Sequence, residues 1–450
     1  MTTSNAPSTS TGEGVPAAVT KRASRQDEAT TEYLLEAVLA GDNLARAWKR
    51  VKANKGAPGI DGVTIEDWPA HARAHWTALR EQIKGGRYWP QAVRRVEIPK
   101  PDGGKRMLGI PTVTDRVVQQ AIAQVLTPIF DPTFSDSSFG FRPGRNAHQA
   151  IRQVQAHVKD GWRIAVDIDL AKFFDTVNHD VLMNLLRQVI ADKRLLALIG
   201  RYLRAGVLVG EHIEPSDIGT PQGGPLSPLL ANILLHQLDR ELQRRGHRFA
   251  RYADDLVILV RSQRGGERVM RSITRYLHTT LKLTVNPAKS KVASMSECSF
   301  LGFTIKGTKI RWTDKALADF KHRVRELTGR SWGVSMEHRL HKLGHYLRGW
   351  FGYFGISEYY TPVPDLDDWI RRRMRMCYWK QWRWVRTKIR HLLGLGVSLK
   401  PAIQHAASSQ SYWHMARTPA LQQALSNAWL KAQGLVSVKD LWCKAQGYTA

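Results

Sequence analysis

The chain has 450 residues, with 67 Lys or Arg against 39 Asp or Glu, so its formal net charge is +28. Such a length exceeds what one hydrophobic core usually supports, and such a charge favours a polyanionic partner, nucleic acid before an anionic membrane. Three cysteines that lie far apart exclude a disulfide framework and a Cys-x-x-Cys zinc site, and no apolar run is long enough to span a membrane.

The N-terminal third is expected to hold a tail, three helices and one β-hairpin. Residues 1–30 are rich in Ser, Thr, Pro and Gly and lack the apolar stretch of a secretory signal, so we expect a disordered tail. TEYLLEAVLAGDNLARAWKRVKANKG predicts two short helices broken at Gly41-Asp42. RRVEIPKPDGGKRMLGIP, residues 94–111, predicts a hairpin with basic residues around its turn, and TDRVVQQAIAQVLTPIF predicts a helix that ends before Pro128.

The middle of the chain alternates strands and helices, and the last third is helical. WRIAVDIDLAKFFDTV predicts a buried strand that reaches Leu170, and NHDVLMNLLRQVI predicts a helix capped by Asn178. GTPQGGPLSPLLANILLHQLDRELQRRG predicts a loop and a long helix, and RFARYADDLVILVRS predicts two strands joined by a turn over Tyr252–Asp255. From about residue 315 the sequence is helical in pattern, basic and rich in Trp. We therefore expect a mixed α/β body followed by an α-helical part.

Four aspartates suggest a metal site. Asp167 and Asp169 share a face of the AVDIDL strand, because side chains alternate along a strand, and a tight turn lets Asp254 and Asp255 aim at one place. Brought together, these carboxylates would repel one another unless cations neutralised them, and hard oxygen ligands suit Mg²⁺. We predict two Mg²⁺ ions that assist an in-line phosphoryl displacement. The alternative for such an Asp-Asp pair is a solvated turn or a salt-bridge partner.

Eight segments resemble, in the same order, the successive blocks of reverse transcriptases encoded by group II introns. They are KANKGAPGIDG, RRVEIPKPDGGKRMLGIP, FSDSSFGFRPGRNAHQA, AVDIDLAKFFDTVNHD, GTPQGGPLSPLLANILL, RYADDLVIL, LTVNPAKSKV and FLGF. The resemblance implies an α/β (α+β) right-hand polymerase with fingers and a palm built on an antiparallel sheet. It further implies an RNA template, deoxynucleoside triphosphate substrates and a bacterial cytoplasmic location.

The resemblance also implies a domain order. We expect an N-terminal extension with fingers over 31–140, a palm over 141–310, an α-helical thumb or maturase domain over 311–400 and a small DNA-binding region over 401–450. The last two rest on LGHYLRGWFGYFGISE and SYWHMARTPALQQALSNAWLKAQGLVSVKDLW, which resemble the maturase-specific region. Many relatives carry a His- and Cys-containing endonuclease module, which this sequence lacks, so we expect no endonuclease activity.

Catalytic roles follow from the matching motifs. Counting back from the second Phe of the block makes Asp169, rather than Asp167, the metal ligand that joins Asp254 and Asp255. The carbonyl of Leu170 completes one metal site. The residues that match the nucleotide-binding positions of the family are Lys100, Arg106, Phe174, Gln222, Gly223 and Lys289.

The resemblance implies a role for each of these nucleotide-binding positions, and alternatives stay open for the residues that bind the triphosphate and the sugar. Lys100 and Arg106 are expected to bind the triphosphate, with Lys105 and Arg116 as alternative residues. The other interpretation is that these residues only form a solvated basic turn. Phe174 excludes a ribose 2′-hydroxyl, with Phe173 as the other candidate. Gln222 lies against the incoming nucleotide, glycine at 223 lets the backbone approach it, and Lys289 faces a phosphate backbone.

The segment RRRMRMCYWKQWRWVRTKIR, residues 371–390, has no acidic residue and alternates basic with aromatic side chains. Basic groups neutralise phosphates and aromatic faces stack on bases, so this segment is predicted to bind RNA. A core-facing stripe through Met374 and Tyr378, or a helix on a lipid surface, is the alternative. The residues predicted to contact RNA are Arg371, Arg372, Arg373, Arg375, Lys380 and Arg383.

Together these features predict an RNA-directed DNA polymerase that copies intron RNA and assists its splicing. Its expected partners are intron RNA, a DNA target or primer and deoxynucleoside triphosphates, with no membrane. A splicing factor with a vestigial polymerase site and a reverse transcriptase domesticated for defence are the alternatives. The intact Asp169, Asp254 and Asp255 argue against the first, and the maturase-like region argues against the second.

Overall fold

The computed structural model describes residues 31–99, 104–209, 212–214, 218–220 and 223–448. Its contacts divide the chain into two compact units that interleave in sequence. The first unit holds the chain up to Gly144 together with Ile168–Gly246 and Arg271–Ser290; the second holds Arg145–Asp167, His247–Met270 and Lys291–Ala450. The expected tail lies outside the described residues, and the domain order expected from the sequence stays a prediction.

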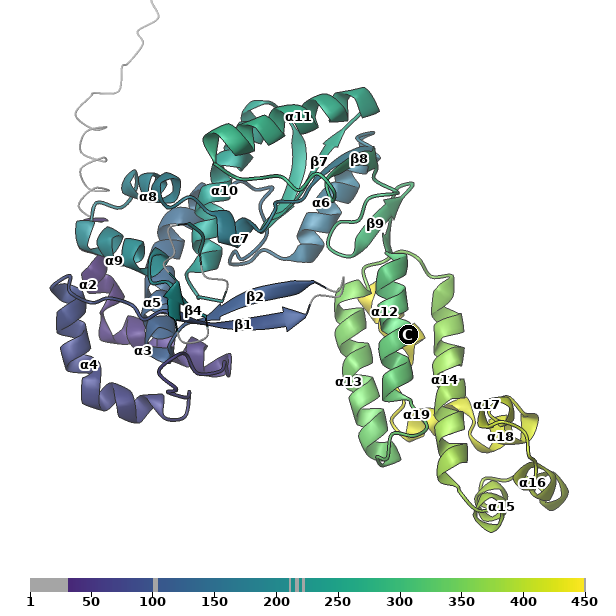
Figure 1. Cartoon of the computed structure of the whole chain (residues 1–450). Coiled ribbons are helices and arrows are strands. Elements are labelled where there is room, and N and C mark those ends of the chain that lie inside the picture. The colour runs from purple at the N-terminus through teal and green to yellow at the C-terminus, as the bar shows by residue number, and fades with distance from the viewer. Residues whose placement is uncertain (1–30, 100–103, 210–211, 215–217, 221–222, 449–450) are drawn as a thin grey trace, which may run out of the picture. The chain divides into compact units, whose positions relative to one another are not determined.

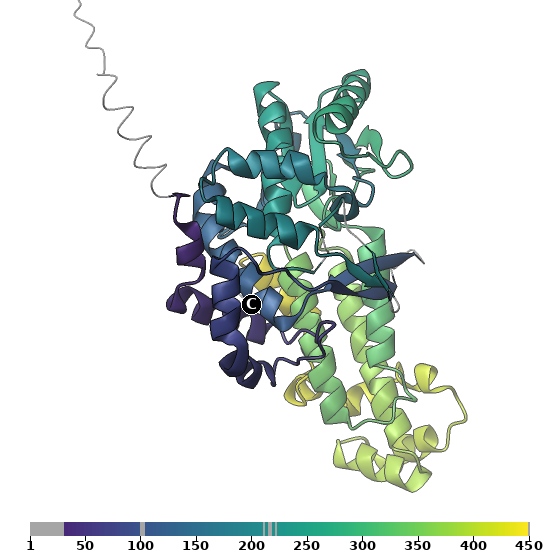
Figure 2. The same ribbon diagram turned by 60° about the vertical axis from the view of Figure 1, so that its left-hand side comes forward.

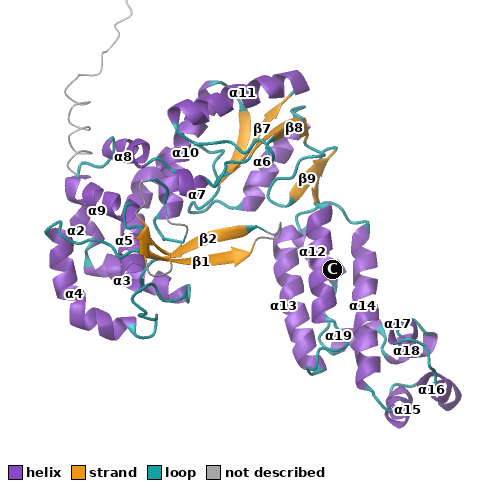
Figure 3. Cartoon of the chain, in the orientation of Figure 1, coloured by secondary structure: helices purple, strands orange, loops and turns teal. Residues whose placement is uncertain are grey.

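The strands of the first unit form a sheet in the order β2-β1-β4-β5, and Figure 3 labels its long strands β1 and β2. Strand β1 pairs with β2 antiparallel, with Arg94 opposite Ile110, which confirms the predicted hairpin. Strand β1 also pairs with β4 in parallel, and β4 pairs with β5 antiparallel. The bounds are Val93–Pro99 for β1, Lys105–Ile110 for β2, Val207–Val209 for β4 and His212–Glu214 for β5.

Helices make up the rest of the first unit, and α5 is one of its two longest buried helices. The Thr112 hydroxyl caps α5 by accepting a bond from the Asp115 amide. The helix continues through Pro128 to Phe130, so the predicted end before Pro128 is wrong. A proline removes only one backbone hydrogen bond near a helix end, and Phe130 is buried there. The bounds are α2 Leu34–Val38, α3 Gly41–Ala53, α4 Trp68–Lys84, α5 Val113–Phe130, η1 Asp131–Thr133, α7 Phe173–Thr176, α8 His179–Arg187, α9 Lys193–Leu203 and α10 Ser227–Arg244.

The second unit is built on a sheet with the strand order β6-β7-β3-β8. Strand β6 (Arg248–Tyr252) pairs antiparallel with β7 (Asp255–Val260), and β3 (Ile164–Ile168) pairs antiparallel with β8 (Lys291–Ser294). Helix α6 (Ala147–Lys159) packs against β6 and β7. The division between the units crosses helix α11 (Gln263–Thr280). This helix packs closely on β8 at Gly266, where a Cβ would lie 2.4 Å from a Val292 methyl group.

A helical region completes the second unit after a short hairpin of β9 and β10. Helices α12, α13 and α14 run alongside one another in both views (Figures 1 and 2). One hydrophobic core extends from Trp312 to Trp442, so residues 401–450 share the core of the preceding helices. The bounds are β9 Phe303–Lys306, β10 Lys309–Trp312, α12 Asp314–Leu327, α13 Met336–Phe354, α14 Pro362–Gln381, α15 Val385–Gly394, α16 Leu399–Ala406, α17 Tyr412–Met415, α18 Pro419–Ala424, α19 Asn427–Ala432 and α20 Val438–Ala445.

None of the helices in the described part of the chain is both long enough and apolar enough to cross a membrane.

Candidate active site

The predicted turn in RYADDL is present between β6 and β7. Tyr252 stands opposite Asp255 in the register, and Ala253 adopts a φ of 58°, in the left-handed region that few residues with a side chain occupy. The turn itself consists of Ala253 and Asp254, so Asp254 and Asp255 follow one another where the chain reverses. The Asp254 side chain is half-buried and that of Asp255 is exposed, which leaves two carboxylates at one end of the hairpin.

A buried arginine supports this turn. Arg251 is fully buried in β6 and donates a hydrogen bond from Nη1 to the Ala253 carbonyl, 2.8 Å away. This bond fixes the peptide that carries the strained Ala253 next to Asp254. The sequence analysis missed Arg251, although a charged residue inside an apolar strand segment was a signal, because such a residue is almost never buried without a partner.

Helix α13 reaches the same hairpin. The Tyr353 hydroxyl donates to the Leu301 carbonyl, 2.9 Å away, and the Tyr353 carbonyl lies 2.7 Å from Nε2 of His148. Burial raises the pKa of Tyr353, and the nearby Tyr252 and Asp255 raise it further. The C-terminal end of α13 therefore lies close to the turn, a contact that the sequence did not reveal.

The first predicted carboxylates lie at the end of β3. Burial alternates from Val166 to Leu170, with both aspartates more exposed than their neighbours, as expected for Asp167 and Asp169 on one face. Asp167 stands opposite Lys291 of β8. Asp169 follows the last residue of β3, so the regular strand ends before the predicted Leu170.

The segment before β8 holds the backbone of Asp169 on both sides. The Asp169 amide donates to the Ser290 hydroxyl at 3.0 Å, and its carbonyl accepts from the Asn286 amide at 2.8 Å. The Ala171 amide donates to the Thr284 carbonyl at 2.8 Å. Lys289 is exposed in the same segment, and its contact with a phosphate group stays a prediction.

No three His, Cys, Asp or Glu side chains of the described residues gather as they would around a metal ion. The oxygen ligands of the sequence prediction, carboxylates and a carbonyl, are nevertheless the donor types that Mg²⁺ prefers. Asp254 and Asp255 belong to the second unit, whereas Asp169 and Leu170 are counted with the first. The shared metal site stays a prediction.

The structure distinguishes the two phenylalanines at the start of α7. Phe173 is buried with 3% of its surface exposed, whereas Phe174 is only partly buried, and the two rings meet edge to face with centroids 5.1 Å apart. The Phe174 carbonyl accepts a bond from the Thr220 amide at 2.6 Å. This bond ties Phe174 to the TPQGG segment.

Glycine at 223 is required by close packing against β2. Its φ is 121°, and a Cβ there would lie 2.6 Å from the Gly109 carbonyl oxygen. The sequence analysis assigned this glycine to the approach of a nucleotide, but its nearest neighbour is the protein's own strand. Gln222 and Lys100 lie outside the described residues, as does the side chain of Arg106.

Gly223 also lines a pocket of about 300 Å³ together with Gly109 and Arg116. Arg116 donates to the Ala57 carbonyl at 2.7 Å, and its buried Nε has no partner among the described residues. Burial lowers the pKa of this guanidinium. Lys105, the other alternative for the triphosphate, forms an ion pair with Glu97 across the hairpin.

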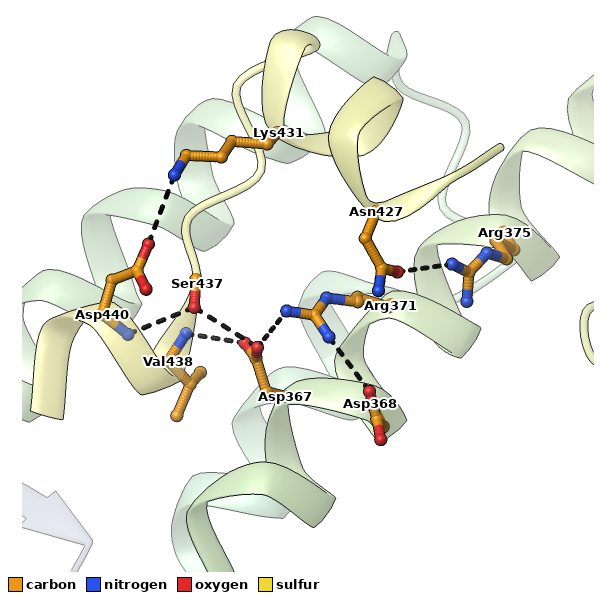
Figure 4. Close-up of polar contacts among 9 residues, drawn as sticks. All are labelled: Asp367, Asp368, Arg371, Arg375, Asn427, Lys431, Ser437, Val438 and Asp440. Carbon is orange, nitrogen blue, oxygen red and sulfur yellow. Dashed lines mark hydrogen bonds and ion pairs between the residues drawn. The ribbon is translucent and has the colours of Figure 1, made fainter. Parts of the chain in front are cut away.

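The first arginines of the basic segment make contacts within the chain, and their predicted binding to RNA stays a prediction. Arg371 pairs with Asp367 and with Asp368, and Asp367 also accepts from the Val438 amide at 2.7 Å (Figure 4). Arg375 has 7% of its surface exposed and donates to the Leu425 carbonyl and to Asn427. Arg375 therefore joins α14 directly to the C-terminal segment. Arg371 pairs with Asp367, which makes a second contact between α14 and that segment.

Arg372 and Arg373 also make contacts within the chain. Arg372 lies 3.9 Å from the centre of the Trp413 ring and donates to the Trp413 carbonyl. Arg373 donates to the hydroxyl and the carbonyl of Thr328, at the end of α12. Lys380 and Arg383 differ, because both are exposed and each lies about 5 Å from an aromatic ring, at 5.0 and 5.2 Å respectively.

Two family models match the chain. Residues 98–305 match "Reverse transcriptase (RNA-dependent DNA polymerase)", and residues 317–394 match "Group II intron, maturase-specific domain". The two matches together include the β6–β7 hairpin, α7 and all of α14.

Curated proteins and solved structures are also similar. Protein YkfC of Escherichia coli (strain K12) is 32% identical over 62% of this chain and 83% of its own length. Group II intron-encoded protein LtrA of Lactococcus lactis subsp. cremoris is 29% identical over 58% of this chain and 54% of LtrA, so the match spans about half of LtrA. A partial Cas6-RT-Cas1–Cas2 complex is 24% identical, with a TM-score of 0.37, over 55% of this chain and 42% of that chain.

A reverse-transcriptase domain followed by a maturase-specific domain, on a fold of antiparallel sheets and a helical C-terminal region, defines the type of protein. This chain belongs to the family of group II intron-encoded reverse transcriptases and maturases.

Proposed function

We propose that this protein copies intron RNA into complementary DNA, by phosphoryl transfer with two metal ions, and assists the splicing of that intron. The observation that carries the polymerase part is the β6–β7 hairpin. There a buried Arg251 and a left-handed Ala253 hold two adjacent carboxylates, Asp254 and Asp255, at one end of the hairpin.

The sheet order supports a shared site for the third carboxylate. Strand β7 is the neighbour of β3, and neighbouring strands lie about 4.8 Å apart. Asp169 follows the end of β3, and Asp255 is the first residue of β7.

Two Mg²⁺ ions, held by Asp169, Asp254, Asp255 and the Leu170 carbonyl, would supply activation of the primer hydroxyl and neutralisation of the charge on pyrophosphate. The protein's part is to fix these ligands. The Asn286 and Ser290 bonds hold the backbone of Asp169, and the Ala253 turn orients the other two carboxylates. The primer 3′-oxygen bonds to the α-phosphorus as the bond to the β-phosphate breaks.

The nucleotide would lie between the hairpin of β1 and β2 and the start of α7. Phe174 is the accessible ring of its pair and would exclude a ribose 2′-hydroxyl by its bulk. Lys100 and Arg106 would bind the triphosphate, Arg106 through its two-pronged guanidinium. Gln222 would contact the base and Lys289 a phosphate group.

The maturase part rests on the match to the maturase-specific domain. Lys380 and Arg383 are the residues of the predicted set that expose their charges, so they would contact the phosphates of intron RNA. A DNA target or primer is the second nucleic-acid partner, and the helices of 401–450 would contribute to DNA binding. Reinsertion of the intron into DNA and a cytoplasmic location follow from the same reading.

Primer extension tests the polymerase part. Full-length protein, an RNA template with an annealed DNA primer, deoxynucleoside triphosphates and Mg²⁺ should yield complementary DNA. Asp254→Asn should lower the rate at least ~10³-fold, because it removes a charged ligand needed for transition-state stabilisation. The matched control is Asp160→Asn, an exposed aspartate after α6, which should keep the wild-type rate.

Splicing is measured separately. Wild-type protein should raise the splicing rate of its intron RNA at low Mg²⁺ concentration, and Asp254→Asn should retain this effect. Absence of primer extension by the wild-type protein, with splicing intact, would support the splicing factor without polymerase activity. Extension without any effect on splicing would remove the maturase part alone.

A further inference from the structure

A pocket of about 310 Å³ lies between α14, α15 and α19, outside the candidate polymerase site. Its walls come from the last turns of α14, from the C-terminal half of α15 and from the segment around α19, so three separate parts of the helical region enclose it. The residues that line it are Tyr378, Trp382, Arg390, His391, Gly394, Leu395, Trp429 and Gln433.

Aromatic rings form two sides of this pocket. The rings of Trp382 and His391 stack with centroids 4.6 Å apart and planes 11° from parallel. Tyr378 and Trp429 meet edge to face at 5.0 Å. Trp382 and Tyr378 are buried, whereas His391 and Trp429 are partly exposed, so the accessible ring of each pair faces the ligand space. Accessible aromatic rings are the groups on which unstacked bases pack in proteins that bind single strands.

The surroundings of the pocket carry no negative side chain in the sequence. No Asp or Glu occurs between Arg371 and Lys439, a stretch that supplies every wall of the pocket. A cation would therefore find no carboxylate on these walls, and it would meet the guanidinium of Arg390. A ligand with negative charge near its ring is favoured, which fits a nucleotide better than a lysine or arginine side chain.

Two polar side chains remain available at the pocket. Arg390 and Gln433 are exposed, and neither side chain makes a hydrogen bond or an ion pair with any residue that the structure describes. Burial lowers the pKa of His391, with a further contribution from Arg390, so this ring stacks in its neutral form at neutral pH. An amide can read a base edge, and a guanidinium can bind the adjoining phosphate.

We propose that this pocket binds an unstacked nucleobase of single-stranded RNA, with the base against Trp429 and His391 and its phosphate near Arg390. The inference rests on the proposed RNA partner and names where one nucleotide of that RNA is held. It assigns a part to Trp429 and Gln433, which lie beyond the residues matched by the maturase model.

The test measures the affinity of full-length protein for a short fluorescent single-stranded RNA of repeated uridine, and for the same strand with abasic positions. Trp429→Ala should weaken binding of the intact RNA about tenfold, because base–aromatic stacking contributes on this scale. Trp429→Phe should restore most of the affinity. The matched control is Trp89→Ala, an exposed tryptophan outside the pocket with 57% of its surface accessible, which should stay within about twofold of wild type.

The abasic strand separates base binding from charge. Trp429→Ala and wild-type protein should bind it equally, whereas Arg390→Ala should lower the dependence of log K on log salt concentration by about one. Equal losses for Trp429→Ala and Trp89→Ala on intact RNA, or the same tenfold loss on the abasic strand, would overturn the pocket. A single-stranded DNA bound as tightly as RNA would overturn the RNA assignment.

Failure of the pocket and failure of the proposed function are distinguishable. If wild-type protein extends primers but Trp429→Ala binds RNA normally, only the pocket is wrong. If wild-type protein binds RNA through Trp429 but extends no primer, only the polymerase assignment is wrong. Thermal unfolding of each variant shows whether a loss of binding reflects loss of the fold.

Discussion

Two arginines of the basic segment should respond in opposite ways to the same substitution. Arg375 is buried and donates from Nε to the Leu425 carbonyl at 2.9 Å and from Nη2 to Asn427 at 2.7 Å. Arg383 is exposed and lies 5.2 Å from the Trp384 ring. Replacement of either by Met keeps the aliphatic stem and removes the charge, so the difference between the two variants isolates the donors.

The size of the effect follows from these contacts. Hydrogen bonds from a charged group contribute about 1.5–3 kcal/mol each, and relief of the desolvated charge offsets part of the loss. We expect Arg375→Met to lower the free energy of unfolding by about 3 kcal/mol, or ~6–12 °C in melting temperature for a unit of this size. Arg383→Met should cost about 0.5 kcal/mol.

Thermal unfolding and RNA binding at several salt concentrations measure the two quantities. Arg383→Met should lower the slope of log K against log salt concentration by about one, and Arg375→Met, measured well below its melting temperature, should leave it unchanged. Unchanged stability of Arg375→Met together with a lower salt slope would refute the assignment of this arginine to the fold and restore it to the RNA surface.

Four further substitutions have defined outcomes. Phe174→Ala should raise incorporation of ribonucleotides at least ~10-fold in primer extension, while Phe173→Ala should lower the free energy of unfolding by about 3–5 kcal/mol because its ring is buried. Gly223→Ala should lower stability by at least ~1 kcal/mol in urea unfolding, since its φ is 121° and its Cβ would lie 2.6 Å from the Gly109 oxygen. Burial raises the pKa of Asp115, so the folded state holds its proton more tightly and the free energy of unfolding should fall as pH rises from about 4 through the folded pKa. Asp115→Asn should weaken the pH dependence of the free energy of unfolding in this range, as measured by urea unfolding. A pH dependence as steep as that of the wild-type protein would contradict the assignment of this effect to Asp115.

Local patterns predicted the parts of the site that depend on neighbouring residues. The apolar segments on both sides of RYADD placed the turn between β6 and β7, because alternation must stop where the chain reverses. The cap at Asn178 and the hairpin of β1 and β2 were also predicted from local patterns. Each depends on side chains a few positions apart, which a sequence displays directly.

Contacts between distant segments were not predictable in this way. Nothing in the sequence links Arg375 to Leu425, and the bonds of Asn286 and Ser290 to Asp169 cross more than a hundred positions. The ion pair between Asp367 and Arg371 is an exception that the sequence could have predicted. Asp367 precedes Arg371 by four residues, which is the spacing of neighbours on a helix face. A count of charges cannot tell which of them face inward.

The contacts of the inward-facing arginines explain why the long stretch between Arg371 and Lys439 can lack Asp and Glu. Arg373 donates to the Thr328 carbonyl at the C-terminal end of α12, and Arg375 donates to the Leu425 carbonyl at the end of α18. Helix C-termini carry partial negative charge and unpaired carbonyl groups, so a guanidinium there replaces both a capping residue and an acidic partner.

This arrangement separates the charges of the helical region into two groups with different consequences. Arginines bound to carbonyl groups stabilise the fold, and we expect their charge to act only weakly on a bound RNA. We expect the exposed cations, among them Lys380, Arg383 and Arg390, to set the field that RNA meets. The salt dependence of RNA binding should therefore follow the number of exposed cations that contact phosphates rather than the net charge of +28, because only phosphates that are neutralised release counterions.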